Sequence, residues 1–197
     1  MKQIVLASGN AGKLGELSAL LAPLGIEVLP QSLFAVSEAA EPHPSFIENA
    51  IAKARHASRA TKLPALGDDS GLCVEALGGA PGVLSARFAG EPKSDQRNNA
   101  LLLERLASAS DRRARFYCAL ALVRHADDPQ PLIACGEWHG EILSAARGSD
   151  GFGYDPLFLV PDLEQTAAEL TAELKNILSH RGSAMRQLLE KLRQEIA

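Results

Sequence analysis

Two adjacent carboxylates, Asp68 and Asp69, follow the apolar stretch 64–67 and lie between two glycines. If this segment is extended, the two side chains point to opposite faces, so one acid can bind a cation while the other orients water or holds a lysine. Hard carboxylate oxygens without a nearby histidine or cysteine favour Mg²⁺ over zinc, and Glu41 offers a further ligand. The alternative is an Asx turn with solvated acids. The segment therefore predicts either a magnesium site or a surface turn.

A second candidate is the loop Ser8-Gly9-Asn10-Ala11-Gly12-Lys13, which follows the apolar run 3–7. Its glycines would let backbone N–H groups approach an anion at a helix N-terminus, and Lys13 adds a positive charge. The spacing is not that of a Walker A loop, because only two residues separate the glycines and Leu14 follows the lysine. The loop predicts either a phosphate site or a tight turn with a solvated lysine.

Two groups near the C-terminal end complete the chemical inventory. Phe152-Gly153-Tyr154-Asp155 combines aromatic faces, a flexible joint and a carboxylate, which suits either the wall of a nucleobase pocket or a packed turn. Lys175 precedes Ser179-His180-Arg181 by a few residues and adds a third possible donor. The two basic side chains could equally be solvated charges, and the histidine could be structural.

The elements that position these groups can be recognised from spacing. A strand over 3–7, a helix ending at Gly25 and a strand over 26–29 predict a βαβ unit. Ser45 and Glu48 have capping-box spacing and predict a helix over 45–61, with Asn49 and Lys53 on one face.

Further along the chain, strands are expected over 64–67 and 72–77, and a long antiparallel pair over 115–123 and 131–143. The spacing of Thr166 and Glu169 predicts another helix start. Because helices and strands alternate, the fold class is α/β with a mixed sheet.

Composition narrows the range of functions. The chain has 197 residues, a net charge of −4 and 5% aromatic residues, which argues against nucleic-acid binding on a basic face or a stacking platform. The three cysteines, Cys73, Cys118 and Cys135, are expected to be core thiols. No run of 18 apolar residues occurs and the N-terminal apolar run is short, so we expect a cytoplasmic protein without membrane segments.

Six motifs taken together are similar to the motif series of the inosine triphosphatase family, the dITP/XTP pyrophosphatases. They occur in the family's order and span essentially the whole chain: SGNAGK (8–13), SFIENAIAKA (45–54), DDSGL (68–72), LGGAPGVLSARFAG (77–90), GFGYDPLF (151–158) and SHRG (179–182). The resemblance implies an elongated, two-lobed α/β fold with a long central mixed sheet flanked by helices. It further implies that residues 1–197 form one domain with the active-site cleft between its lobes, and that the protein is a homodimer.

The same resemblance implies Mg²⁺-dependent hydrolysis of ITP, dITP and XTP to the monophosphate and pyrophosphate. Lys13, Lys53 and the 8–13 loop would bind the phosphates, and Asp69 would be the proton acceptor and a Mg²⁺ ligand. Glu41 and Asp68 would support the metal. The residues expected to contact the nucleotide are Ser70, Phe152, Gly153, Tyr154, Asp155, Lys175, His180 and Arg181.

Three other functions are alternatives to this one. A haloacid-dehalogenase-type phosphatase needs an aspartate nucleophile at the end of its first strand, where this chain has Ala7-Ser8-Gly9-Asn10. A septum-associated pyrophosphatase of similar fold would act on pyrimidine or modified nucleotides, and the SHR and FGYD motifs argue against it. A nucleotide-binding module without catalysis stays open.

Overall fold

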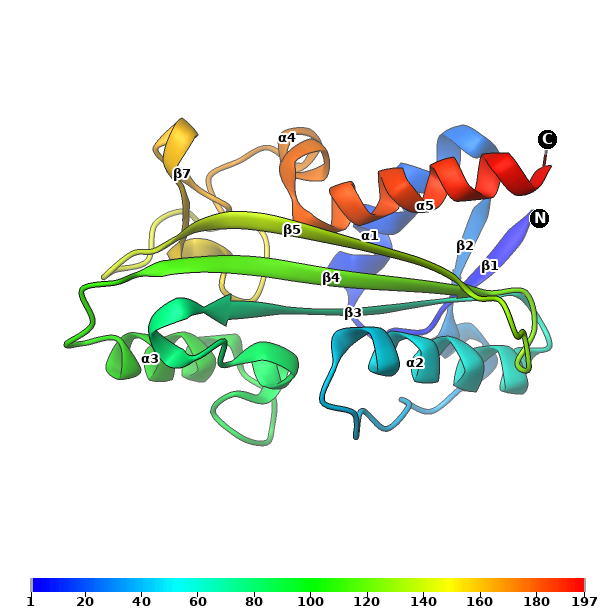
Figure 1. The fold of residues 1–197 in the computed structure, drawn as a ribbon, viewed down its shortest axis with the longest axis horizontal. Helices are drawn as coiled ribbons and strands as arrows, with labels where there is room; N and C mark the ends of the chain where they lie inside the picture. Colours follow the sequence, from blue (N-terminus) through cyan, green and yellow to red (C-terminus); the bar gives the residue numbers. More distant parts are fainter. Residues whose placement is uncertain (1, 197) are drawn as a thin grey trace. The chain divides into compact units, whose positions relative to one another are not determined.

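The protein has an α/β fold, seen in a computed structural model that describes the backbone of residues 2–196 and the side chains of residues 2–194 (Figure 1). The α-helices are α1 (Ala11–Leu21), α2 (Phe46–Thr61), α3 (Asp95–Arg105), α4 (Ala172–Leu178) and α5 (His180–Ile196). The strands are β1 (Gln3–Leu6), β2 (Glu27–Pro30), β3 (Ala65–Val74), β4 (Arg113–Val123), β5 (Leu132–Ile142), β6 (Phe158–Val160) and β7 (Gln165–Thr166). None of the helices described has the length and apolar character needed to cross a membrane.

The strands form a seven-stranded sheet in the order β2-β1-β3-β4-β5-β6-β7. β1 is parallel to both β2 and β3, whereas β6 is antiparallel to β5 and β7. β4 and β5 are neighbours joined by the short segment 124–131, which is too short for a parallel crossover, so they form an antiparallel hairpin. The mixed sheet predicted from the sequence is thereby confirmed.

The chain divides into two compact units, and β3, β4 and β5 each run from one unit into the other. Unit 1 comprises the residues up to 69, residues 118–136 and the residues from 180 onward. Unit 2 comprises residues 70–117 and 137–179. The division point in β3 lies directly after the two adjacent aspartates.

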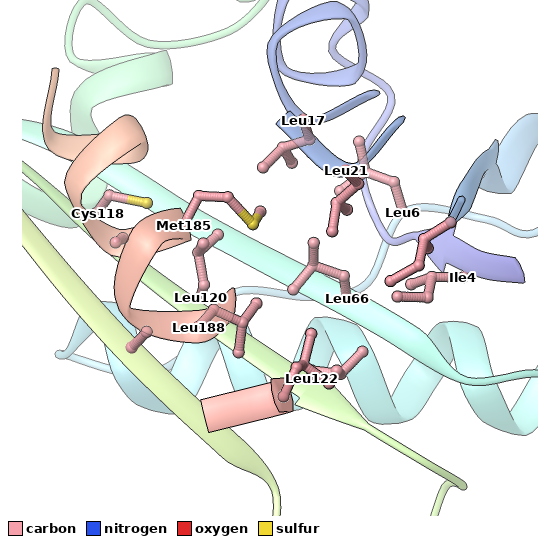
Figure 2. Packing of buried hydrophobic residues seen from close by; sticks show 14 residues of the cluster. Ile4, Leu6, Leu17, Leu21, Leu66, Cys118, Leu120, Leu122, Met185 and Leu188 are labelled. Carbon is pink, nitrogen blue, oxygen red and sulfur yellow. The ribbon is translucent and has the colours of Figure 1, made fainter. Parts of the chain in front are cut away.

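Unit 1 has helices on both faces of its strands, with α1 and α5 on one face and α2 on the other (Figure 1). Its core is built on the α1 and α5 side, where side chains from two helices and several strands converge (Figure 2). Fully buried members of that cluster include Leu6, Leu17, Leu66, Leu120 and Met185. A sheet buried on both faces holds the residues at the carboxyl end of β1 and in the middle of β3 in fixed positions.

Two glycines set how closely the helices approach these strands. A Cβ atom at Gly67 would lie 2.0 Å from the carbonyl oxygen of Ala50, so α2 packs directly against the backbone of β3. A Cβ atom at Gly136 would lie 2.1 Å from the carbonyl oxygen of His180 and 2.7 Å from the backbone nitrogen of Ala184, so α5 packs equally closely on β5. Only glycine fits at either place.

Unit 2 has its own core, which centres on three aromatic rings. The ring centroid of Phe158 lies 4.6 Å from that of Phe116 and 5.2 Å from that of Trp138. These separations are typical of favourable aromatic pairs. Apolar side chains of α3, including fully buried Leu102, complete the cluster.

Several sequence predictions about local structure are confirmed and others are wrong. Ser45 caps α2, and its hydroxyl oxygen accepts a hydrogen bond from the Glu48 N–H at 3.3 Å. The expected strands 64–67 and 72–77 merge into one continuous strand, β3, which ends at Val74, and residues 75–77 form a 3₁₀ helix instead. The Asx-turn alternative for the two aspartates is therefore wrong. Thr166 ends β7 rather than capping a helix, and α4 begins later, after its N-cap Thr171.

The cysteine prediction is confirmed for two residues only. Cys73 and Cys118 are buried, whereas Cys135 is partly exposed. β5 alternates between buried and exposed positions, and Cys135 precedes the buried-face residue Gly136 by one position. The run of apolar residues in the sequence therefore did not show which side chains of this strand face the core.

Asp128 closes the β4–β5 hairpin, and we predict that this contribution depends on pH. Its carboxylate accepts hydrogen bonds from the Arg124 Nε at 2.9 Å and from the backbone N–H groups of Arg124 and Gln130, each also at 2.9 Å. The Arg124 side chain, above all, holds the pKa of Asp128 below its usual range. Because the folded-state pKa is lowered, the stabilisation is present above the unfolded-state pKa of about 4 and is lost as the pH falls through the folded value.

Asp128→Asn should therefore lower the free energy of unfolding by about 1.5–3 kcal/mol at pH 7, since charged acceptors are stronger than neutral ones. Urea denaturation at pH 7 and pH 3 should show this difference shrinking at the lower pH. The neighbouring variant Asp127→Asn is the control, because the side chain of Asp127 is 86% exposed. A difference that is the same at both pH values would contradict the prediction.

Candidate active site

The candidate site begins with the alternation of side chains along β3. Gly67 and Asp69 face α2, since Gly67 abuts that helix and the carboxylate of Asp69 contacts Lys53 of α2. Asp68 points to the opposite face, where it contacts residues of α1 and α5. The prediction that an extended segment gives the two acids different partners is thereby confirmed.

Asp68 lies at the centre of a buried charge network. Its Oδ1 accepts a hydrogen bond from the Lys13 Nζ at 2.5 Å, and its Oδ2 accepts one from the Arg181 Nε at 2.7 Å. Glu16 of α1 pairs with the other side of the Arg181 guanidinium. Burial by itself would raise the pKa of Asp68, but Arg181 and Lys13 together lower it well below the usual range. The Asp68 carboxylate is thus fully buried, ionised and held between two cations.

Asp69 is held by one lysine and one amide from α2. Its Oδ1 accepts a hydrogen bond from the Lys53 Nζ at 2.6 Å, and its Oδ2 accepts one from the Asn49 Nδ2 at 3.3 Å. Lys53 also forms an ion pair with Glu41. Burial raises the pKa of Asp69 above its ordinary value, and Lys53 only partly offsets this. Asp69 is consequently a stronger base than a solvated aspartate.

The charge of Lys53 is secured by the same contacts. Burial lowers the pKa of this ammonium group, but Asp69 and then Glu41 raise it by more, so it lies above the ordinary lysine value. Lys53 therefore carries its positive charge at neutral pH, between two carboxylates.

The 8–13 loop turns directly into α1. The Asn10 Oδ1 accepts a hydrogen bond from the Lys13 backbone N–H at 3.1 Å, and the Ser8 Oγ accepts one from the Asn10 N–H at 3.1 Å. Ala11 and Gly12 form the first turn of the helix, which contains no acidic residue. Because helix N-termini present backbone N–H groups and a partial positive charge, this loop together with Lys13 suits an anion.

In unit 2, the 152–155 turn is tied together through one carboxylate. The Asp155 Oδ2 accepts hydrogen bonds from the Phe152 N–H at 2.8 Å and from the Lys175 Nζ at 2.6 Å. The Lys175 ammonium also lies 4.8 Å from the centroid of the Phe152 ring. The Phe152 ring of the turn and the buried ammonium group of Lys175 therefore lie next to each other, in a cation–π contact.

Helix α3 fixes the other end of this turn. The Asp95 Oδ2 accepts a hydrogen bond from the Gly153 N–H at 2.7 Å, and the Asn99 Nδ2 donates one to the Gly153 carbonyl at 2.9 Å. The Tyr154 hydroxyl donates to the Ser85 carbonyl at 2.8 Å, and burial raises the pKa of Tyr154, so the hydroxyl stays protonated. Helix α3 therefore binds both the N–H and the carbonyl group of Gly153.

The predicted site residues divide between the units. Unit 1 contains the 8–13 loop, Glu41, Lys53, Asp68, Asp69, His180 and Arg181. Unit 2 contains Ser70, the 152–155 turn and Lys175. Each unit thus holds one group of the predicted site residues.

Sequence reasoning missed four residues that hold these clusters: Glu16, Asn49, Asp95 and Asn99. The four-residue spacing predicts that Asn49 shares a helix face with Lys53, but it indicates no role for the amide. Glu16 lies one turn after Lys13, which was the available signal that it belongs to the same face of the helix.

The donor set fits a hard divalent cation that takes only part of its ligands from the protein. Asp69 and Glu41 supply carboxylate oxygens around Lys53, and the ammonium occupies a cation position between them. Among the described side chains, those of residues 2–194, no group of three or more histidine, cysteine or acidic residues is close enough to hold a metal alone. Mg²⁺ commonly uses one or two carboxylates together with substrate phosphates, so two protein carboxylates are sufficient.

Comparison with known proteins identifies the family of this chain. A sequence model described as the Ham1 family matches residues 4–191. The chain belongs to the Ham1 family. A relative from Aromatoleum aromaticum named dITP/XTP pyrophosphatase is 72% identical over 190 residues, with 96% of each chain covered. Another of the same name from Chromobacterium violaceum is 63% identical, with 97% of each chain covered.

Solved structures agree with this Ham1 assignment. The structure of a HAM1 protein from Coxiella burnetii matches with a TM-score of 0.90 and 50% identity, covering 98% of this chain and 100% of that one. The Ham1 protein of Staphylococcus aureus matches with a TM-score of 0.86 and 39% identity. The resemblance drawn from the six motifs is therefore confirmed at the level of family and fold.

Proposed function

We propose that this protein hydrolyses non-standard purine nucleoside triphosphates, namely dITP, XTP and ITP, to the monophosphate and pyrophosphate in a Mg²⁺-dependent reaction. The observation that carries the proposal is the pair Asp68 and Asp69 on opposite faces of β3, each with its own lysine. Relatives at 63–72% identity that are named dITP/XTP pyrophosphatase support the substrate class.

The basic residues of unit 1 can neutralise part of the negative charge of the substrate. A triphosphate carries about four negative charges, which repel an incoming water until cations offset them. Lys13 stands at the N-terminus of α1, and Lys53 lies beside Asp69, so both ammonium groups can turn from carboxylate to phosphate. Bound Mg²⁺ would supply further charge neutralisation and lower the pKa of a bound water.

Asp69 is the residue we assign to orient the attacking water and accept its proton. Its pKa is raised by burial, which brings it closer to the pH at which a general base works best. Asp69 and Glu41 are also the residues that would hold the metal. The sequence also suggested Asp68 as a ligand, but its carboxylate is fully buried whereas that of Asp69 is 8% exposed, so we assign Asp68 to positioning Lys13 and Arg181.

The cluster of unit 2 is assigned to the nucleobase. The Phe152 ring offers a face for stacking, and Lys175 offers a donor for the 6-oxo group of hypoxanthine or xanthine. Adenine presents a 6-amino donor there, and a buried donor left facing another donor costs about 1–3 kcal/mol. By their motif, Ser70, His180 and Arg181 are proposed as further nucleotide contacts. This division of roles rests on the family motifs.

The family resemblance also leads us to propose a homodimer that works in the cytoplasm. None of the three described cysteines, Cys73, Cys118 and Cys135, is in a disulfide, which suits a reducing compartment. Light scattering on the purified protein measures the oligomeric state directly.

The decisive test of the proposed function is the first product formed. Purified protein with Mg²⁺ and ITP should release pyrophosphate and IMP, because attack at the α-phosphorus breaks the bond between the α and β phosphates. Chromatography of the products over time distinguishes this from orthophosphate release. Orthophosphate as the first product would indicate attack at the γ-phosphorus and contradict the proposal.

A panel of substrates tests the remaining alternatives. Turnover should be faster with dITP, XTP and ITP than with ATP or pyrimidine triphosphates. Preference for pyrimidine nucleotides would favour the septum-associated activity, whereas binding without turnover would favour a non-catalytic module.

A further inference from the structure

Asn49 is a buried polar residue of α2 that the proposed reaction does not use. Asn49 is only 1% exposed to solvent. The Oδ1 accepts a hydrogen bond from the His43 N–H at 3.1 Å. The Nδ2 donates to the His43 carbonyl at 3.1 Å and to the Asp69 Oδ2 at 3.3 Å. The amide thus uses its acceptor and both donor hydrogens on two separate parts of the chain.

These three bonds connect the carboxylate of Asp69 to the backbone segment that carries Glu41. Two of them fix the backbone of His43, which lies two residues after Glu41 in the segment between η2 (Gln31–Phe34) and α2. The third fixes the carboxylate of Asp69. Asn49 therefore determines where the Glu41 segment lies relative to Asp69.

Lys53 lies one turn further along the same helix face and also joins these acids, by an ion pair with each. The three N–H groups of the Lys53 ammonium contact Asp69, Glu41 and the Asp68 carbonyl, so at least one of these contacts is lost when the ammonium binds a phosphate. The amide of Asn49 has no charge to offer a phosphate, so its contacts can persist when Lys53 turns to the substrate. Two residues with similar partners consequently have different roles.

We propose that Asn49 is a positioning residue that sets the spacing of Asp69 and the Glu41 segment and so presents two carboxylates to a divalent cation. This inference rests on the proposed function, because it takes these carboxylates as the metal ligands. It adds a residue outside the expected ligand and substrate contacts, one that acts only through its neighbours.

Two uncharged variants of Asn49 test this role. Asn49→Ala and Asn49→Leu each remove all three bonds, and Asn49→Leu does so with a side chain of similar branched shape and without adding a charge beside Asp69. Without metal, hydrogen exchange of residues 41–45 should be at least ten-fold faster in Asn49→Ala than in the wild type. Mn²⁺, followed by electron paramagnetic resonance, should bind both variants about 10–100-fold more weakly, as is usual when a residue that orients a ligand is lost.

Steady-state kinetics with ITP give a further readout. The Mg²⁺ concentration for half-maximal rate should rise about 10-fold or more in both variants, since metal affinity falls. The KM for ITP at saturating Mg²⁺ should stay within three-fold of the wild type. A purely structural role would instead lower the fraction of folded enzyme and leave both constants unchanged.

Asn98→Ala is the matched control. Asn98 is 2% exposed, lies on α3 and, like Asn49, holds a loop, through bonds to the Ala89 N–H at 2.8 Å and the Ala86 carbonyl at 3.1 Å. It should lower the melting temperature as Asn49→Ala does, but change Mn²⁺ affinity less than two-fold.

Wild-type exchange rates over 41–45 and wild-type Mn²⁺ affinity in Asn49→Ala would overturn the inference. A wild-type protein that releases no pyrophosphate from ITP would instead contradict the proposed function. In that case the exchange measurement still decides whether Asn49 positions the Glu41 segment.

Discussion

Asp69→Asn is expected to reduce the kcat for pyrophosphate release from ITP by about 10³-fold, within the range typical for loss of a general base. The amide has the same shape and can still accept a hydrogen bond from Lys53, but it cannot take a proton from water. It is also a weaker ligand for a divalent cation. Nucleotide binding, measured by calorimetry, should change little, because Asp69 is assigned to water and metal rather than to the base.

The same substitution at an exposed aspartate provides the control for this experiment. Asp162 lies on the surface in a short 3₁₀ turn, so Asp162→Asn should retain the wild-type kcat. If Asp69→Asn also kept most of its turnover, another group would have to accept the proton, and the assignment of Asp69 would be wrong.

Asp68→Ala should cause the largest loss of stability among the site variants, about 3–5 kcal/mol in the free energy of unfolding. The reason is that Arg181 is 2% exposed and would lose the carboxylate bound to its Nε. The Arg181 guanidinium would keep its pair with Glu16 but lose the carboxylate at its Nε, in an interior where water cannot replace that carboxylate. Lys13 would lose its partner as well, but its side chain is 13% exposed and can reach water more easily. Urea denaturation at pH 7 measures the effect.

Glu75→Ala tests whether burial is the cause. Glu75 also forms an ion pair with an arginine, Arg115, at 2.5 Å, but its side chain is 47% exposed. Exposed pairs contribute about 0–1 kcal/mol, so this variant should lose little stability. Similar losses in the two variants would mean that the buried network around Asp68 has no special importance for the fold.

Short-range signals predicted the elements that carry the site. The capping box of Ser45 and Glu48 marked the start of α2, and the spacing of Asn49 and Lys53 placed both on the helix face that contacts Asp69. Such features succeed because helix capping and helical periodicity are decided within a few residues.

Contacts between distant residues could not be derived in this way. Asp68 and Arg181 are 113 residues apart. The sequence contains 20 basic residues, and spacing alone does not tell which of them reaches a given aspartate. That pairing follows from the sheet order and from the packing of α5, both of which depend on the whole chain.

The sequence predicts two strands where β3 is continuous and leaves a turn open between them, and this has a specific physical origin. Gly67 and its neighbouring acids suggest a turn, because glycine and aspartate are common in turns. Here the glycine serves close packing within a strand, which leaves no local signature. The glycine at position 67 therefore favoured a turn at Asp68 and Asp69, where the chain forms a strand.

The contact between Gly67 and Ala50 also limits how the enzyme can be engineered. A library that randomises the residues around Asp69 to accept bulkier substrates would include position 67 by simple proximity. Every side chain at this position would collide with main-chain atoms of the helix that carries Lys53, and main-chain atoms cannot adopt another rotamer to make space. Folded members of such a library should therefore keep glycine at 67, and changes in substrate range will have to come from side chains elsewhere in the protein.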